Sequence, residues 1–149
     1  MVGPDAAIPR LKQQIAMVKS AKSRFESSLF DIRQLLQADL FDSELEAASH
    51  LLKNNFARAA GALAGVVLER HLGEVCASHK LPLRKKDPSI NDLNQALKDA
   101  GVIETSQWRF VQLLGDIRNT CDHSKDAEPT AADVKELVDG VAKVTKTIF

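Results

Sequence analysis

The sequence predicts an all-α protein: an up-and-down antiparallel helical bundle of about five to six helices, with a long N-terminal helix. Apolar residues recur at spacings of three and four along nearly the whole chain, and no segment shows the two-residue alternation of a strand. Helix-starting residues precede several of these segments. With 149 residues, 44% of them hydrophobic, the chain is long enough for one core.

The N-terminal helix is predicted from Leu11, with Pro9 near its start. Its apolar residues alternate spacings of four and three, broken only by Lys22, and so form a narrow seam. A seam of this kind needs a partner, which is either the rest of the bundle or a second copy of the chain. We therefore assign residues 1–42 to a dimerisation or linker element and residues 43–149 to the bundle. The seam residues are Leu11, Ile15, Val18, Phe25, Leu29, Ile32 and Leu36.

Two helices are predicted next along the chain. Ser43 begins a capping-box sequence, Ser-Glu-Leu-Glu, which predicts a second helix ending near Asn55. A third helix is predicted over residues 56–78, and its first half is apolar on almost every side, which indicates the central, most buried helix. Gly61 and Gly65 in this helix would allow close approach of neighbouring backbones, so their spacing favours tight core packing.

Three further helices are predicted after a loop that is bounded by Pro82 and Pro88. Ser89 caps the first of them, and Gly101 ends it. Thr105 opens the next, and Thr130 opens the last. The core-facing residues of these last two helices are Trp108, Val111, Leu114, Ile117 and Cys121, then Val134, Leu137, Val141, Val144 and Ile148.

Composition excludes several classes of protein. Twenty basic residues balance twenty acidic ones, so no global positive field would hold nucleic acid unselectively. The two cysteines, Cys76 and Cys121, form no disulfide framework, and a reducing cytoplasm is the simpler expectation. The longest apolar run, residues 59–68, is about half of a membrane span, and the N-terminus lacks the order of a signal peptide. We expect a cytoplasmic protein with no membrane partner and no cofactor.

The segment from Arg118 to His123 concentrates the chemistry of the chain, because it places a permanent cation beside a group that titrates near neutral pH. In an ideal helix residues five apart are turned by roughly 140°, so Arg118 and His123 share a face only where the helix ends. Asn119 and His123 are four apart and do share a face. Spacing alone is better explained by a solvated arginine and a histidine favoured by the helix dipole.

The context of this segment resembles the HEPN family (higher eukaryotes and prokaryotes nucleotide-binding domains). Arg-Asn-x-x-x-His at the end of a penultimate helix resembles the signature of that family. The apolar segment 56–69, the Ser-Ile-Asn-Asp-Leu-Asn segment 89–94, Trp108 and the Glu-Pro-Thr segment 128–130 follow the same order of elements. The resemblance covers roughly residues 43–148.

The resemblance implies a homodimeric, metal-independent endoribonuclease with a composite site, in a toxin or antiviral-defence context. His123 would be the general acid or base, Arg118 would bind the phosphate, and Asn119 would orient the site. RNA would be the substrate, and an antitoxin or a larger defence-system protein a further partner. The alternative is a catalytically inactive helical module that dimerises or binds a protein or nucleotide.

The sequence departs from the family pattern at two positions. Lys125 stands where the members paired with nucleotidyltransferase antitoxins carry a tyrosine, and the chain contains no tyrosine. Asp122 directly precedes His123, where a small apolar residue is commoner. Its carboxylate would raise the pKa of the histidine and repel phosphate.

Other candidate residues have weaker support. Arg84, Lys85, Lys86 and Lys125 are candidates for gripping a phosphate backbone, although loop cations are usually solvated. Glu69 is a candidate to brace Arg118 across the bundle. Three potential metal ligands lie on one helix, but their spacings match no zinc pattern, so no metal is expected. They are His71, Cys76 and His79. Cys121 fits a buried structural thiol better than a nucleophile.

Overall fold

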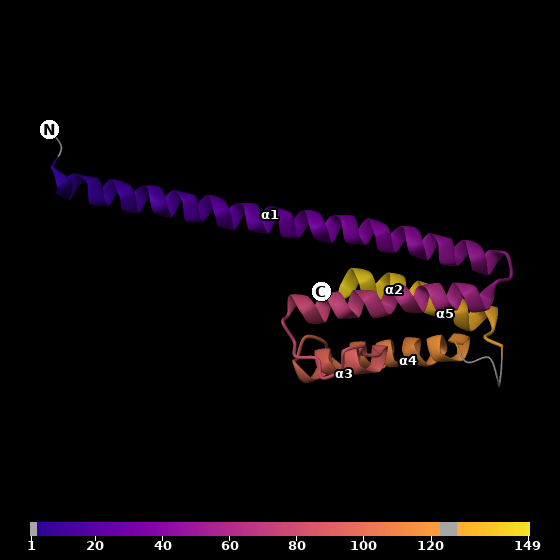
Figure 1. Cartoon of the computed structure of the whole chain (residues 1–149). Helices are drawn as coiled ribbons and strands as arrows, with labels where there is room; N and C mark the ends of the chain where they lie inside the picture. Colours follow the sequence, from indigo (N-terminus) through magenta and orange to yellow (C-terminus); the bar gives the residue numbers. More distant parts are fainter. Residues whose placement is uncertain (1–2, 123–127) are drawn as a thin grey trace. The chain divides into compact units, whose positions relative to one another are not determined.

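The computed structural model describes residues 3–122 and 128–149, and in this part of the chain all regular secondary structure is helical (Figure 1). The predicted all-α class is therefore confirmed. By its contacts the chain divides into residues 1–39 and residues 40–149. The helices are α1 (Pro4–Lys53), α2 (Ala57–Ser78), α3 (Ile90–Asp99), α4 (Thr105–Asp122) and α5 (Ala131–Thr147).

The N-terminal helix is longer than the sequence indicated. It begins at Pro4, so that Pro9 lies inside it rather than at its start, and it continues through Ser43 to Lys53. The predicted helix boundary at Ser43 is wrong. The capping-box sequence there is compatible with a helix interior, and neither glycine nor proline precedes it to end the first helix.

Three helices end with a residue in the left-handed backbone region. After α1 this residue is Asn55 (φ 66°), after α2 it is Lys80 (φ 54°), and after α3 it is Gly101 (φ 70°). In each case the next residue donates its N–H to a carbonyl five residues earlier, as in a Schellman motif; for α2 the bond is Leu81 N to Cys76 O, 3.0 Å. The predicted stop at Gly101 is confirmed.

The caps predicted at the start of α3 and of α5 are also present. The Ser89 hydroxyl accepts from the backbone N–H of Asp92, whose carboxylate accepts in return from the backbone of Ser89, so both halves of the capping box are formed. The Thr130 hydroxyl accepts from the backbone N–H of Asp133 at 3.1 Å.

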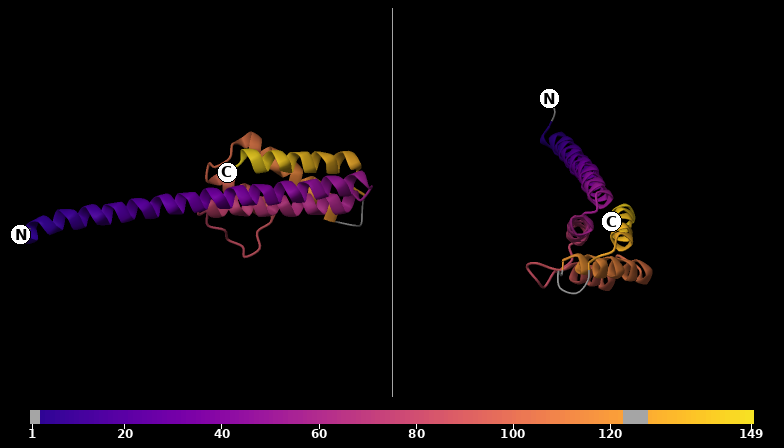
Figure 2. Two further views of the ribbon diagram at one scale, coloured as in Figure 1. Left: turned by 90° about the horizontal axis from the view of Figure 1, so that it is seen from above. Right: turned by 90° about the vertical axis from the view of Figure 1, so that its right-hand side faces the viewer.

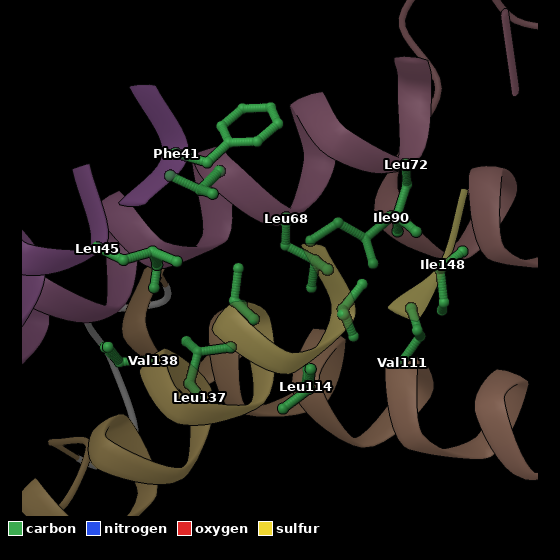
Figure 3. Close-up of a cluster of buried hydrophobic side chains, with 14 of the residues drawn as sticks. Phe41, Leu45, Leu68, Leu72, Ile90, Val111, Leu114, Leu137, Val138 and Ile148 are labelled. Carbon is green, nitrogen blue, oxygen red and sulfur yellow. The ribbon is translucent and has the colours of Figure 1, made fainter. Parts of the chain in front are cut away.

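Within residues 40–149, α2 is the central helix, as predicted, because it packs against α3, α4 and α5. α2 and α5 lie side by side, with α3 and α4 on one side of that pair (Figure 2). Consecutive long helices reverse direction, as Figure 1 shows for α2, α4 and α5. The buried apolar side chains between them form one cluster, which includes Leu68, Leu72, Val111, Leu114 and Leu137 (Figure 3).

The last part of α1 belongs to this cluster. Phe41, Leu45 and Ala48 are buried in it. Arg70 of α2 forms an ion pair with Glu44, in which Nη1 of the arginine donates to Oε2 of the carboxylate at 3.0 Å. Residues 40–53 therefore pack as a helix of the bundle.

No helix in the described part of the chain is both long and apolar enough to cross a membrane.

Candidate functional site

The candidate site lies at the C-terminal end of α4, whose last turns carry Arg118, Asn119 and Asp122. His123 and Lys125, which the sequence assigns to the same site, lie outside the described residues. The geometry of the described part therefore concerns the arginine, its acceptors and the helix against which they pack.

The side chain of Arg118 packs against Gly65 of α2. A methyl group added at Gly65 would overlap Cγ of Arg118 and approach its Nε to 3.2 Å, so the aliphatic stem of the arginine lies directly on the glycine. Its side chain is only 28% exposed. The predicted close packing at Gly65 is thus present, and it fixes the position of the Arg118 side chain.

Three acceptors surround the guanidinium group of Arg118. The Asp122 carboxylate lies 2.9 Å from Nη1, and the Glu69 carboxylate lies 3.6 Å from Nη2. Nη1 also donates to Oδ1 of Asn119 at 3.4 Å. The structure therefore brings together four of the residues that the sequence singled out. The two carboxylates compensate the charge of Arg118, and both pairs are partly solvent-exposed, so each stabilises the fold by about 1 kcal/mol at most.

Arg58 is a part of this region that sequence reasoning missed. Its Nη1 donates to the carbonyl oxygen of Cys121 at 2.8 Å, which satisfies one of the carbonyls that α4 leaves without a helical partner. Arg58, Gly61, Gly65 and Glu69 are spaced by three, four and four residues, so they lie on one face of α2. This spacing was the sequence signal that could have placed Arg58 near the site. The four residues form one stripe of α2, with a charged residue at each end and glycines between them, and this stripe faces the end of α4.

Cys121 is a buried thiol, as the sequence favoured. It packs on Gly61, where an added methyl group would overlap its Sγ. Burial raises the pKa of the Cys121 thiol, and the neighbouring Asp122 carboxylate raises it further. A thiol that stays protonated at neutral pH is a poor nucleophile.

The basic loop is not brought to this site. It follows the C-terminal end of α2, whereas Arg118 packs on Gly65 in the first half of that helix, and 13 residues of helix span about 20 Å. Arg84 and Lys86 are exposed. Lys85 donates to Asp92 at 2.9 Å, and this bond, with those from Ser89, lowers the pKa of Asp92 to about 2.

The three residues considered as metal ligands have other contacts. His71 is buried with Nε2 2.9 Å from the carbonyl oxygen of Ile148, and His79 places Nε2 3.0 Å from that of Phe149. The thiol of Cys76 points at the carbonyl oxygen of Leu93. Within residues 3–122 and 128–149, no cluster of three or more His, Cys, Asp or Glu side chains could hold a metal ion.

An open groove of about 480 Å³ lies elsewhere in residues 40–149, between the end of α1 and α5. Its lining includes His50, Lys53 and Lys146, and Arg118 is not part of it.

No protein-family model, curated protein or solved structure matches this chain.

Proposed function

We propose that this protein is a metal-independent endoribonuclease of the HEPN type, acting as a homodimer on single-stranded RNA. The observation that carries the proposal is the fixed position of the Arg118 side chain. Gly65 and the two carboxylates hold its guanidinium group at the last turn of α4, directly before His123 in the chain. A cation fixed in advance stabilises the charge of a phosphoryl transition state without having to be ordered during the reaction.

The proposed reaction needs a base, an acid and a cation. His123 takes the proton of a ribose 2′-hydroxyl, the 2′-oxygen forms a bond to the adjacent phosphorus, and the bond from phosphorus to the 5′-oxygen breaks. His123 of the second copy, in its protonated form, gives a proton to the leaving 5′-oxygen. Arg118 binds the non-bridging phosphate oxygens, for which a planar guanidinium group is suited. The products are a 2′,3′-cyclic phosphate and a 5′-hydroxyl.

Asp122 gives this site a specific constraint. Its carboxylate forms an ion pair with Nη1 of Arg118 at 2.9 Å, so an RNA phosphate has to displace this carboxylate or bind at the remaining edge of the guanidinium group. Asp122→Asn removes the competing charge, and we expect it to lower KM for RNA. The measurement is steady-state cleavage at fixed ionic strength, with wild-type protein alongside.

The central test is cleavage of a labelled single-stranded RNA in excess chelator. We expect His123→Ala and Arg118→Ala each to slow cleavage by about 100-fold or more. Arg109→Ala is the matched control, because Arg109 is an exposed arginine of the same helix, and its cleavage rate should stay within about twofold. Cleavage at the wild-type rate by a folded His123→Ala variant would refute the proposal.

A second candidate function is a non-catalytic helical module that binds a partner protein. The observation that favours it is the pairing of Arg118 with both Glu69 and Asp122, because these three charges sum to −1 and leave no net positive charge for a phosphate. RNA binding measured from about 50 to 200 mM salt separates the two functions, because contacts to several phosphates make affinity fall steeply with salt. An antitoxin or a larger defence-system protein is a proposed partner in either case.

A further inference from the structure

Residues 4–39 form one uninterrupted stretch of α1 with an apolar seam that is exposed. At 1.5 Å per residue this stretch is about 54 Å long. The seam side chains are between 39% and 69% exposed. They are Ile8, Leu11, Ile15, Val18, Phe25, Leu29, Ile32 and Leu36.

The seam follows a heptad pattern that is apolar at every a and d position except Lys22. Counting Ile8 as position a, the a positions are Ile8, Ile15, Lys22, Leu29 and Leu36, and the d positions are Leu11, Val18, Phe25 and Ile32. A seven-residue repeat over four heptads is the pattern of a coiled coil, in which each seam side chain inserts between four residues of a facing helix. A single lysine at an a position is a known device for fixing register at some cost in stability.

The size of the seam matches what a stable dimer needs. Burial of one aliphatic or aromatic side chain removes roughly 60–120 Å² from water, so eight of them bury roughly 500–1,000 Å² on each chain. A standard interface between two proteins buries about 800 Å² on each partner. Left uncovered, a seam of this area would lie at or above the upper end of the range for the largest apolar patch of a typical monomer, about 300–600 Å².

The charges beside the seam are compatible with a second copy of this chain as the occupant. In a parallel, in-register pair, each g position faces the following e position of the partner helix. The g positions are Gln14, Ala21, Ser28 and Leu35, all uncharged, and the first three face Lys19, Glu26 and Arg33. No like charges meet along these flanks. In an antiparallel pair, e positions face e positions, and centring the seam would place Lys12 against Arg33 and Lys19 against Glu26, so one of the two e-position pairs is repulsive.

We propose that the α1 seam pairs with the same seam of a second copy of this chain, as a parallel, in-register, two-stranded coiled coil. This inference stands on α1 alone and does not depend on the proposed nuclease activity. Lys22 is the one charged layer. Its Nζ lies 3.8 Å from Glu26 of the same helix, which partly offsets the approach of two lysines across the seam.

The first experiment measures the association of the full chain by sedimentation equilibrium, comparing two phenylalanines five residues apart. Phe25 (64% exposed) is at a d position, and Phe30 (50% exposed) is at a b position, outside the seam. We expect Phe25→Glu to raise the dimer dissociation constant by about 100-fold or more, and Phe30→Glu to change it by less than about threefold. A monomeric wild-type chain, or equal effects of the two variants, would overturn the proposal.

The second experiment tests the parallel orientation by disulfide cross-linking under mild oxidation. Leu11→Cys at a d position should form a cross-linked dimer, because the two copies of this residue meet in a parallel pair. In an antiparallel pair Leu11 would face Leu36, about 37 Å along the helix from its own copy. Gln13→Cys, at an f position on the outer face, is the control and should stay uncross-linked. Failure of Leu11→Cys to cross-link while the wild-type chain is dimeric would refute the parallel arrangement.

Discussion

At the scale of single residues, the two glycines of α2 determine how closely α4 approaches. Gly61 accommodates Cys121, and Gly65 accommodates the stem of Arg118. The absence of a side chain therefore has a direct consequence for the candidate site, since any larger residue at position 65 would move the guanidinium group away from Glu69 and Asp122.

Gly65→Ala tests this consequence, with Gly73→Ala as a matched control in the same helix. A methyl group at Gly65 overlaps Arg118, whereas one at Gly73 meets no atom within 4 Å. We expect Gly73→Ala to raise the free energy of unfolding by about 0.5–1 kcal/mol, because alanine favours the helix, and Gly65→Ala to lower it by about 1–2 kcal/mol. Urea denaturation measures both. An equal gain for the two variants would show that Arg118 is not tightly seated.

At the scale of the helices, the structure could be predicted wherever the determining signal is local. The caps at Ser89 and Thr130 and the stop at Gly101 were predicted correctly, because a cap depends on residues within one turn. The boundary at Ser43 was predicted wrongly, because a capping sequence starts a helix only where the preceding helix ends. The contact of Arg58 with Cys121 joins residues 63 positions apart, so the spacing of Arg58 on α2 indicates the helix face on which it lies but not its partner. The role of His123 stays a prediction.

The end of α2 offers a prediction about helix termination. Lys80 has φ 54°, a conformation that costs a residue with a Cβ atom about 1 kcal/mol. We expect Lys80→Gly to raise the free energy of unfolding by about 0.5–1 kcal/mol, since glycine is the usual residue at this position of a Schellman motif. Lys80→Ala keeps the Cβ atom and is the control, with no gain expected. Thermal unfolding of the two variants in parallel distinguishes backbone strain from an effect of the lysine charge.

At the scale of the whole molecule, both proposals require two copies of the chain, but they can fail independently. The coiled-coil proposal depends on exposed apolar residues of α1, and its measurement is the dissociation constant. The nuclease proposal depends on Arg118 and His123, and its measurement is RNA cleavage. A dimer that Phe25→Glu dissociates and that cleaves no RNA would support the seam and leave the non-catalytic module as the function.

His71 makes the stability of the bundle formed by residues 40–149 depend on pH. It lies on α2, its ring makes a T-shaped contact with Phe41, and its Nε2 lies 2.9 Å from the carbonyl oxygen of Ile148, so it joins three parts of that bundle. Burial lowers the pKa of His71, and this effect outweighs the backbone hydrogen bonds to Ile148 and Val144, which raise it. The folded protein therefore keeps the ring neutral at a pH where the unfolded chain already binds a proton.

The sign of the pH effect follows from this difference. Above the unfolded pKa of about 6.5 both states hold a neutral ring, and the contribution of His71 to stability is fully present. As the pH falls through 6.5 toward the lower pKa of the folded state, the unfolded chain binds the extra proton, so the free energy of unfolding falls by up to about 1.4 kcal/mol per pH unit. Urea denaturation at pH 7.5, 6.5 and 5.5 should show this loss in the wild-type chain. His71→Gln, which cannot titrate, should show a flatter profile over the same range, and an equally steep profile in that variant would assign the acid sensitivity to other groups.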